Sequence, residues 1–247
     1  MLKVYWRPGC SSCVRVKEFL TGLGVSYESI NVSARPEAME ELRQLGVRTV
    51  PVVARGSDYV FAQELADVSR FIGRDVDFDR LAPAALVGKW INVLNAAQRH
   101  VMQIPAGRLR ERATEGRDRS IRDLAYHVYQ IADAFLQAVE NGVENLTEVY
   151  NAPPPDSVRS VDDIRAYGAG VTRDVGEWWA SRPDTSRMVK TYYGLQPLHH
   201  LLERCTWHSA QHARQIIAVL ERFGIEADGP LTAQDYAGLP LPAGLWE

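Results

Sequence analysis

Apolar and polar positions alternate with two different periods along the first 75 residues. Short apolar or alternating runs predict four strands, at residues 2–6, 25–32, 49–53 and 59–61. Helical spacing of apolar residues predicts three helices, from the Cys10–Cys13 segment through Leu20 and at residues 36–45 and 64–72. Gly46 and Gly73 follow the second and third helices as stop signals. The pattern therefore predicts an α/β domain over residues 1–75 with the order β-α-β-α-β-β-α.

Strand signals vanish after a polar connector at residues 76–82. The remaining apolar stripes repeat at helical spacing and predict four helices, at residues 83–103, 120–141, 160–182 and from 195 or 198 to 223. A proline-rich break at 151–156 separates the second helix from the third. Four long helices predict an all-α four-helix bundle over 83–224. Residues 225–247, rich in glycine and proline, are expected to form an extended tail.

The composition narrows the class of protein. A chain of 247 residues with a formal charge of −3 is long enough for two domains and lacks the basic excess of a nucleic-acid-binding protein. No apolar run approaches the roughly 18 to 20 residues that span a bilayer. The chain opens on a predicted strand rather than a signal-peptide core, and three cysteines do not make a disulfide scaffold. We expect a soluble cytoplasmic protein with no nucleic-acid or membrane partner.

The pair Cys10 and Cys13 lies between the first strand and the first helix. The partial positive charge at a helix N-terminus favours the thiolate, which is the nucleophilic form of cysteine. The spacing places Cys13 one turn away, where it can attack a mixed disulfide formed on Cys10. A zinc half-site would need a second ligand pair nearby, but the other cysteine is Cys205 and the first histidine is His100. The pair therefore predicts redox chemistry.

The cysteine pair, the Thr49-Val50-Pro51 segment and the order of elements resemble the glutaredoxin branch of the thioredoxin superfamily. The resemblance covers about the first third of the chain. It implies that the Val50–Pro51 peptide bond is cis and that Thr49, Val50 and Pro51 lie beside the cysteines and bind a small thiol. Two serines separate the cysteines here, whereas many glutaredoxins have Pro-Tyr. That departure leaves the reduction potential and the identity of the thiol open.

Three histidines of the predicted bundle form a second candidate site. His208 and His212 are separated by four residues on one helix, so both imidazoles can reach one metal ion. His127 lies on the otherwise apolar face of the second helix. A histidine on such a face is more often a core residue whose hydrogen bonds are satisfied. Bundle cores, however, commonly hold metals between facing helices, so the three together predict a metal site.

The segments 122–128 and 207–216, which contain these histidines, resemble the DinB/YfiT-like family. That family includes mycothiol-dependent maleylpyruvate isomerases and bacillithiol or mycothiol S-transferases. The resemblance implies that His127, His208 and His212 bind a divalent metal, with zinc favoured over nickel or iron. It also implies a low-molecular-weight thiol of the glutathione, mycothiol or bacillithiol type. Family members often form dimers, which leaves a homodimer open here.

Cys205 leaves two interpretations open. It precedes His208 by three residues and His212 by seven, so it falls on the same helical stripe and could be a fourth ligand that closes the site. The alternative is a small buried residue that behaves as an apolar one. His199 and His200 are expected at the surface or just outside the ligand set.

The two resemblances together suggest one function and two alternatives. We expect a metal-dependent enzyme, a transferase or isomerase, that uses a small thiol and an electrophilic or disulfide substrate. An attached thiol-disulfide oxidoreductase domain would use Cys10 as the nucleophile and Cys13 as the resolving thiol. The first alternative is a glutaredoxin-type reductase whose bundle recognises a protein partner. The second is a redox-responsive metal-binding protein without turnover.

Overall fold

The computed structural model describes residues 1–144, 149–150 and 152–246. The chain divides into two compact units, one made of Met1–Asp79 with Pro242–Glu247 and the other of Arg80–Leu241. Each unit is described here by itself. Residue 151, where the predicted proline-rich break begins, lies outside the described residues. Among the described helices, none has the length and apolar character needed to cross a membrane.

The first unit is built on a four-stranded mixed sheet with the strand order β2-β1-β3-β4. Its strands are β1 Lys3–Trp6, β2 Glu28–Asn31, β3 Val52–Arg55 and β4 Asp58–Phe61. Its helices are α1 Ser11–Gly22, α2 Pro36–Gln44 and α3 Leu65–Phe71. Strands β1 and β2 are parallel, whereas β1–β3 and β3–β4 are antiparallel. The predicted α/β order is confirmed.

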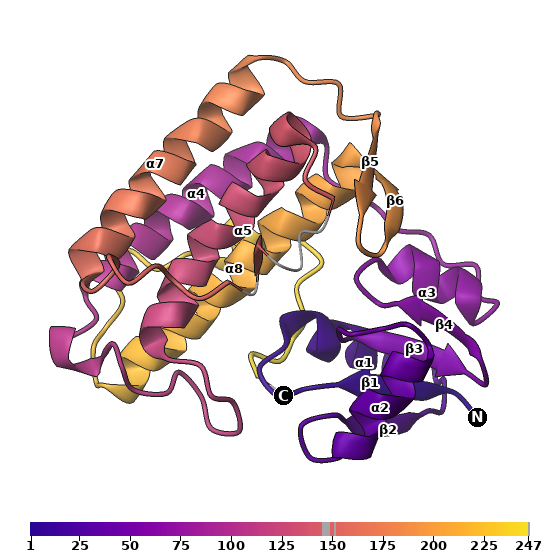
Figure 1. Ribbon diagram of the computed structural model, residues 1–247. Helices are drawn as coiled ribbons and strands as arrows, with labels where there is room; N and C mark the ends of the chain where they lie inside the picture. Colours follow the sequence, from indigo (N-terminus) through magenta and orange to yellow (C-terminus); the bar gives the residue numbers. More distant parts are fainter. Residues whose placement is uncertain (145–148, 151, 247) are drawn as a thin grey trace. The chain divides into compact units, whose positions relative to one another are not determined.

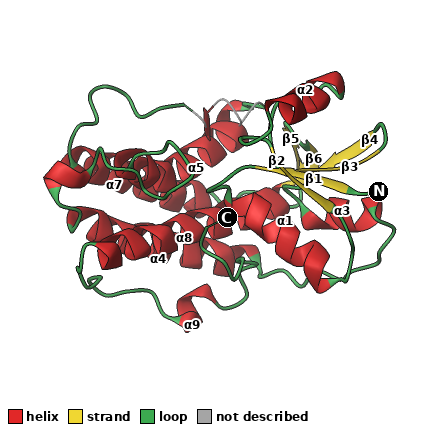
Figure 2. Cartoon of the chain, turned by 90° about the horizontal axis from the view of Figure 1, so that it is seen from below, coloured by secondary structure: helices red, strands yellow, loops and turns green. Residues whose placement is uncertain are grey.

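Helices cover both faces of this sheet, with α1 and α3 on one side and α2 on the other (Figure 2). Side chains of a strand alternate between the two faces, so neighbouring residues of β1 enter different cores. Val4 packs with Leu20 of α1 and Val68 of α3. Tyr5 packs with Leu42 of α2 in the second cluster. Alternation along β1 therefore specifies the three-layer arrangement.

The third predicted strand starts too early in the sequence. Thr49, Val50 and Pro51 precede β3, which begins at Val52. The peptide bond between Val50 and Pro51 is cis, as the resemblance implies. Proline has no N–H to donate to a neighbouring strand, so ladder pairing begins after it. The second strand is likewise shorter than predicted, since only Glu28–Asn31 pair with β1.

The second unit is a four-helix bundle (Figure 1). Its long helices are α4 Pro83–Met102, α5 Ile121–Asn141, α7 Val161–Ala180 and α8 Leu198–Arg222, and a 3-10 turn, η1, spans Ala106–Arg108. Helices α4 and α5 each pack against both α7 and α8. Aromatic rings fill the centre, where Phe135 meets Trp90 at 5.2 Å and Trp178 at 4.9 Å between ring centroids. The predicted bundle is confirmed.

Local signals fix the ends of the bundle helices. Ser120 and Ser160 each form a capping box at the start of a helix, with Asp123 and Asp163 as the reciprocal partners. Gly142 ends α5 in the left-handed conformation, with φ of 67°. The sequence pattern predicts the starts of these two helices at the same serines and the end of the first just before Gly142.

The prediction that strands are absent after the connector is wrong. A two-stranded antiparallel hairpin of β5 Met188–Thr191 and β6 Gly194–Pro197 lies between α7 and α8. Burial alternates along β5, where Val189 and Thr191 are buried and Met188 and Lys190 are exposed. A four-residue strand is too short for its alternation to stand out from the neighbouring helical pattern. Helix α8 consequently begins at Leu198, the later of the two predicted starts.

The C-terminal segment is not extended throughout. A short helix, α9 Ala233–Tyr236, follows a capping box at Thr232. Lys89 of α4 donates hydrogen bonds to the carbonyl oxygens of Gln234 and Asp235, which attach α9 to the bundle. The last residues belong to the first unit, where the backbone N–H groups of Ala243 and Gly244 donate to the Glu18 carboxylate of α1.

Candidate dithiol site and metal centre

The cysteine pair lies where β1 turns into α1. Cys10 is the N-cap of α1, and its sulfur accepts a hydrogen bond from the backbone N–H of Cys13 at 3.2 Å. A sulfur in this position receives both a donor and the positive end of the helix dipole, which stabilise a thiolate. Cys10 is partly exposed and Cys13 is buried, and the two form a disulfide with their Cα atoms 5.2 Å apart. Cys10 is therefore the sulfur accessible to a substrate.

The Thr49-Val50-Pro51 segment lies beside this pair. Val50 belongs to the same apolar cluster as Cys13, and Cys10 packs against that cluster. Val50 and Pro51 are buried, whereas Thr49 is partly exposed. The structure thus brings Cys10, Cys13 and Val50 together, and Thr49 and Pro51 flank Val50 in the chain. The thiol-binding role of Thr49, Val50 and Pro51 stays a prediction.

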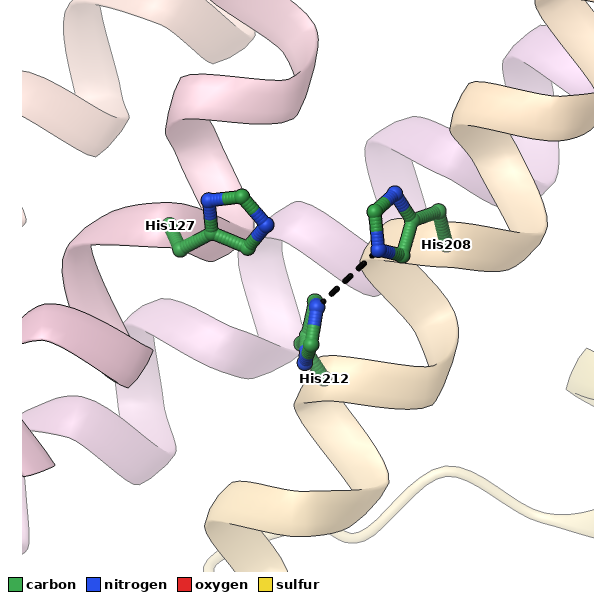
Figure 3. Close-up of side chains that lie close together, drawn as sticks. All are labelled: His127, His208 and His212. Atoms are coloured by element: carbon green, nitrogen blue, oxygen red, sulfur yellow. Dashed lines mark hydrogen bonds between the residues drawn. The ribbon is translucent and has the colours of Figure 1, made fainter. Parts of the chain in front are cut away.

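The three predicted histidines converge inside the bundle. His127 comes from α5, and His208 and His212 come from successive turns of α8 (Figure 3). One ring nitrogen from each histidine lies within 4.8 Å of the corresponding nitrogens of the other two. The Nε2 atoms of His208 and His212 are 3.1 Å apart. His127 and His212 are buried and His208 is partly exposed.

Two glutamines orient the buried rings. The Oε1 atom of Gln130 lies 3.0 Å from Nδ1 of His127, and Oε1 of Gln215 lies 2.6 Å from Nδ1 of His212. An amide oxygen can only accept, so each Nδ1 carries the hydrogen and each Nε2 keeps its lone pair. Outer partners of this kind fix the tautomer and orientation of metal-binding histidines.

The protonation state of the three histidines suits metal binding. Burial lowers the pKa of each one well below its ordinary value, because an imidazolium loses its hydration there. The positive charge of Arg119 acts in the same direction on all three rings. The rings are therefore neutral near pH 7, which is the form that binds a metal.

The donor set fits a divalent metal such as zinc. Two nitrogens on one tetrahedral zinc, with bonds of about 2.0–2.1 Å, lie about 3.3 Å apart. The 3.1 Å separation of the His208 and His212 nitrogens is close to that value. Three histidines leave a fourth position for a small ligand, as in catalytic zinc sites.

Cys205 lies outside the group of three ligands. Its sulfur hydrogen bonds with the hydroxyl of Tyr150 at 3.3 Å, and burial raises the pKa of its thiol. The structure thus favours the interpretation of Cys205 as a buried core residue.

The other histidines of the second unit lie outside the three-histidine cluster. Nε2 of His199 lies 2.7 Å from the carbonyl oxygen of Leu81, where it ties the start of α8 to the segment before α4. His200 is partly exposed, and His100 is fully buried in α4. None of them belongs to the cluster of potential ligands found among the described residues.

Comparison with known proteins agrees with this division of the chain. Residues 2–60 match the glutaredoxin family, and residues 90–216, about half of the chain, match the DinB superfamily. The chain belongs to the DinB superfamily and carries an N-terminal glutaredoxin domain. The histidine cluster lies within the DinB domain, and the cysteine pair lies within the glutaredoxin domain.

Several curated proteins are similar to part of this chain, and the NrdH proteins among them match its N-terminus. Gene 56 protein of Mycobacterium phage L5 is 43% identical over 51 residues, which are 20% of this chain and 50% of that protein. Glutaredoxin-like protein NrdH of Lactococcus lactis subsp. lactis is 31% identical over 62 residues, 25% of this chain and 85% of that protein. NrdH of Escherichia coli K12 is 40% identical over 55 residues, 22% of this chain and 68% of that protein.

The structure adds residues of the DinB domain that sequence reasoning missed. Gln130 holds His127 and also donates to the carbonyl oxygens of Val149 and Ala152. The ring of Tyr150 lies 6.4 Å from the rings of both His127 and His208. The position of Gln130, three residues after His127, repeats the spacing of Gln215 after His212 and could have indicated its role. No local pattern marks Tyr150.

Proposed function

We propose that this chain is a metal-dependent enzyme that uses a low-molecular-weight thiol, as a transferase or isomerase, with an attached thiol-disulfide oxidoreductase domain. The observation that carries the metal-dependent part is the cluster of His127, His208 and His212, whose ring nitrogens lie within 4.8 Å of one another. The observation that carries the redox part is Cys10 at the N-cap of α1 beside Cys13. The glutaredoxin-like proteins that match the first domain support it.

In the DinB domain, Nε2 of His208 and His212, together with the ring nitrogen of His127 that faces them, would hold a divalent metal, with zinc favoured over nickel or iron. When bound, such a metal lowers the pKa of a thiol or water in its open position and so supplies a nucleophile at neutral pH. Gln130 and Gln215 keep the buried rings oriented through their Nδ1 hydrogens. A thiol would reach the site from the side of His208, which is the partly exposed member of the three.

In the glutaredoxin domain, the Cys10 thiolate attacks one sulfur of a substrate disulfide, forms a mixed disulfide and releases the other sulfur as a thiolate. The Cys13 thiolate then attacks the Cys10 sulfur, which completes the Cys10–Cys13 disulfide and releases the second substrate thiol. Two electrons pass from the cysteine pair to the substrate. Two equivalents of a small thiol reduce the pair again and leave as their own disulfide.

The small thiol would be of the glutathione, mycothiol or bacillithiol type, and its partner an electrophile or a disulfide. A cytoplasmic location would suit this chemistry, because the reducing thiol pool there regenerates the cysteine pair. Neither activity needs nucleic acid or a membrane.

The test measures two activities on the full chain loaded with zinc. One assay follows conjugation of each candidate thiol to an electrophile, and the other follows reduction of a small disulfide. We expect His212→Ala to abolish conjugation and leave disulfide reduction intact, and Cys10→Ser to do the reverse. Conjugation by His212→Ala at the wild-type rate would refute the metal-dependent function.

A second candidate is a disulfide reductase whose DinB domain recognises a protein partner. One observation favours it, since the match to NrdH of Lactococcus lactis covers 85% of that protein and lies in the N-terminal part of this chain. In Lactococcus lactis, a protein not much longer than this domain therefore exists without a second domain of this size. This candidate predicts that small-disulfide reduction persists and that no thiol is conjugated by the zinc-loaded chain.

A further inference from the structure

A short segment far along the sequence, residues 242–246, packs on helix α1 of the glutaredoxin domain. It belongs to the first unit, although the residues immediately before it belong to the second. The backbone N–H groups of Ala243 and Gly244 donate to the two carboxylate oxygens of Glu18, each at 2.8 Å. Hydrogen bonds to a charged acceptor are stronger than those between neutral groups. Glu18 therefore holds segment 242–246 at two consecutive residues.

The segment is held on the face of α1 that continues from Cys10. Val14 follows Cys10 by one turn, and its backbone N–H donates to the Cys10 carbonyl oxygen at 3.2 Å. Glu18 follows Val14 by one further turn, so the three residues lie on one face of the helix. Helical side chains lean toward the N-terminus of their helix, so Val14 leans toward the turn of Cys10.

Gly244 brings the backbone of the segment into close contact with this face. A Cβ atom at position 244 would lie 3.3 Å from Cγ1 of Val14, which is tighter than an ordinary van der Waals contact, and 3.4 Å from Oε1 of Glu18. Glycine therefore allows the backbone to approach α1 without displacing Val14. Leu245 and Trp246 are partly buried, so the segment keeps contact with the protein after Gly244.

Helix geometry sets the distance between this contact and the reactive sulfur. One turn of α-helix rises about 5.4 Å, so the segment covers α1 from about one turn beyond Cys10. A small disulfide needs only the exposed part of Cys10. A disulfide of a folded protein also brings the surrounding protein surface against α1, where segment 242–246 already lies.

We propose that segment 242–246 restricts the dithiol site to small disulfides and excludes the disulfides of folded proteins. The inference rests on the redox part of the proposed function and names its substrate class. Selectivity arises here from a steric obstacle to the larger substrate rather than from a contact with the smaller one. Glu18, which holds the segment, is then a specificity-determining residue.

The test compares small and bulky reagents of the same chemistry on the full, reduced chain. N-ethylmaleimide and a maleimide carrying a branched polyethylene glycol report access to the Cys10 thiol, read by intact-mass spectrometry. Hydroxyethyl disulfide and insulin report reduction of a small and a protein disulfide. The quantity compared between proteins is the ratio of the bulky-reagent rate to the small-reagent rate, which cancels any change in the reactivity of the thiol itself.

Two variants remove the contact in different ways. One is a chain that ends at Leu241, and the other is Glu18→Ala, which removes the acceptor of both hydrogen bonds. Both should raise the two rate ratios about tenfold, the factor that corresponds to losing one hydrogen bond to a charged group. The matched control is Glu40→Ala, which removes an exposed glutamate of α2 that pairs with Arg43 and should leave both ratios at the wild-type value.

The proposal is overturned if the rate ratios are the same in the wild type and in Glu18→Ala, or if Glu40→Ala raises them as much. Glu18→Ala decides the question by itself should the shortened chain fail to fold. Failure of the redox function would appear separately, as absence of hydroxyethyl disulfide reduction. The maleimide rates need no turnover and still report whether the segment restricts access to Cys10, so the two failures are distinguishable.

Discussion

Replacing Gln130 by methionine tests whether the histidine cluster is held in place by its surroundings. Gln130 accepts from Nδ1 of His127 and donates to the carbonyl oxygens of Val149 and Ala152. Methionine has a similar length and can make none of these bonds. The variant therefore leaves the Nδ1 hydrogen of a buried ring and two carbonyl oxygens without their partner.

The expected cost follows from those three groups. A buried donor without a partner costs about 1–3 kcal/mol, and the two less buried carbonyl oxygens, which can recover water, add about 1 kcal/mol together. We therefore expect Gln130→Met to lower the free energy of unfolding of the metal-free chain by about 2–4 kcal/mol. For a domain of this size that change lowers the melting temperature by roughly 4–16 °C. Loss of the outer hydrogen bond to His127 should also weaken zinc binding by about 10–100-fold.

The assay combines urea unfolding of the metal-free protein with zinc competition against a chelating dye. The matched control is Gln137→Met, two turns further along α5, where a half-buried glutamine donates only to the Asp133 side chain. That control should change stability by less than about 1 kcal/mol and leave zinc affinity unchanged. Equal stability and equal zinc affinity in the two variants would refute the positioning role of Gln130.

Three further predictions test packing, redox chemistry and pH dependence. Gly168→Ala should destabilise the bundle by about 1–3 kcal/mol, because the new Cβ would lie 2.7 Å from the ring of Tyr129 in α5. The control Gly170→Ala should not destabilise it, because its Cβ would have no atom within 4 Å. Similar unfolding curves for the two variants would contradict this packing. Cys13→Ser should stop at a mixed disulfide with a small thiol, detected by intact-mass spectrometry, and absence of the adduct would contradict Cys10 as the accessible nucleophile. Burial lowers the pKa of His100, so the unfolded chain takes up a proton more readily than the folded chain, and the free energy of unfolding should fall below about pH 6.5. Urea unfolding should show that His100→Leu loses less stability on acidification than the wild type does. Equal losses of stability in the two proteins would contradict this role of His100.

Most of the fold was predictable because its signals are local. The capping boxes at Ser120 and Ser160 and the stop at Gly142 mark helix ends within a few residues of sequence. The hairpin of Met188–Thr191 and Gly194–Pro197 was missed because each strand has only four residues. The start of β3 at Val52 was also missed. A strand begins where its backbone pairs with the neighbouring strand, here β1, and the apolar residues before that point do not reveal it.

The candidate site was predictable only in part, because some of its residues are close in sequence and others come together only in the folded chain. His208 and His212 share one helix, so their spacing alone places them together, whereas His127 was joined to them through the bundle architecture and the family resemblance. Tyr150 carries no local sequence signal, and only the folded chain brings its ring to 6.4 Å from the rings of His127 and His208. Sequence reasoning left Cys205 open because it shares the helical stripe, although its sulfur contacts Tyr150 instead.

Metal content tests the central claim most directly. Elemental analysis would compare the full chain, purified without chelators and reloaded with zinc, with His208→Ala and with His199→Gln, which changes a histidine outside the cluster. The account predicts about one zinc per chain in the wild type and in His199→Gln, and less than about a tenth of that in His208→Ala. The same zinc content in His208→Ala as in the wild type, or no zinc in any of the three proteins, would contradict it.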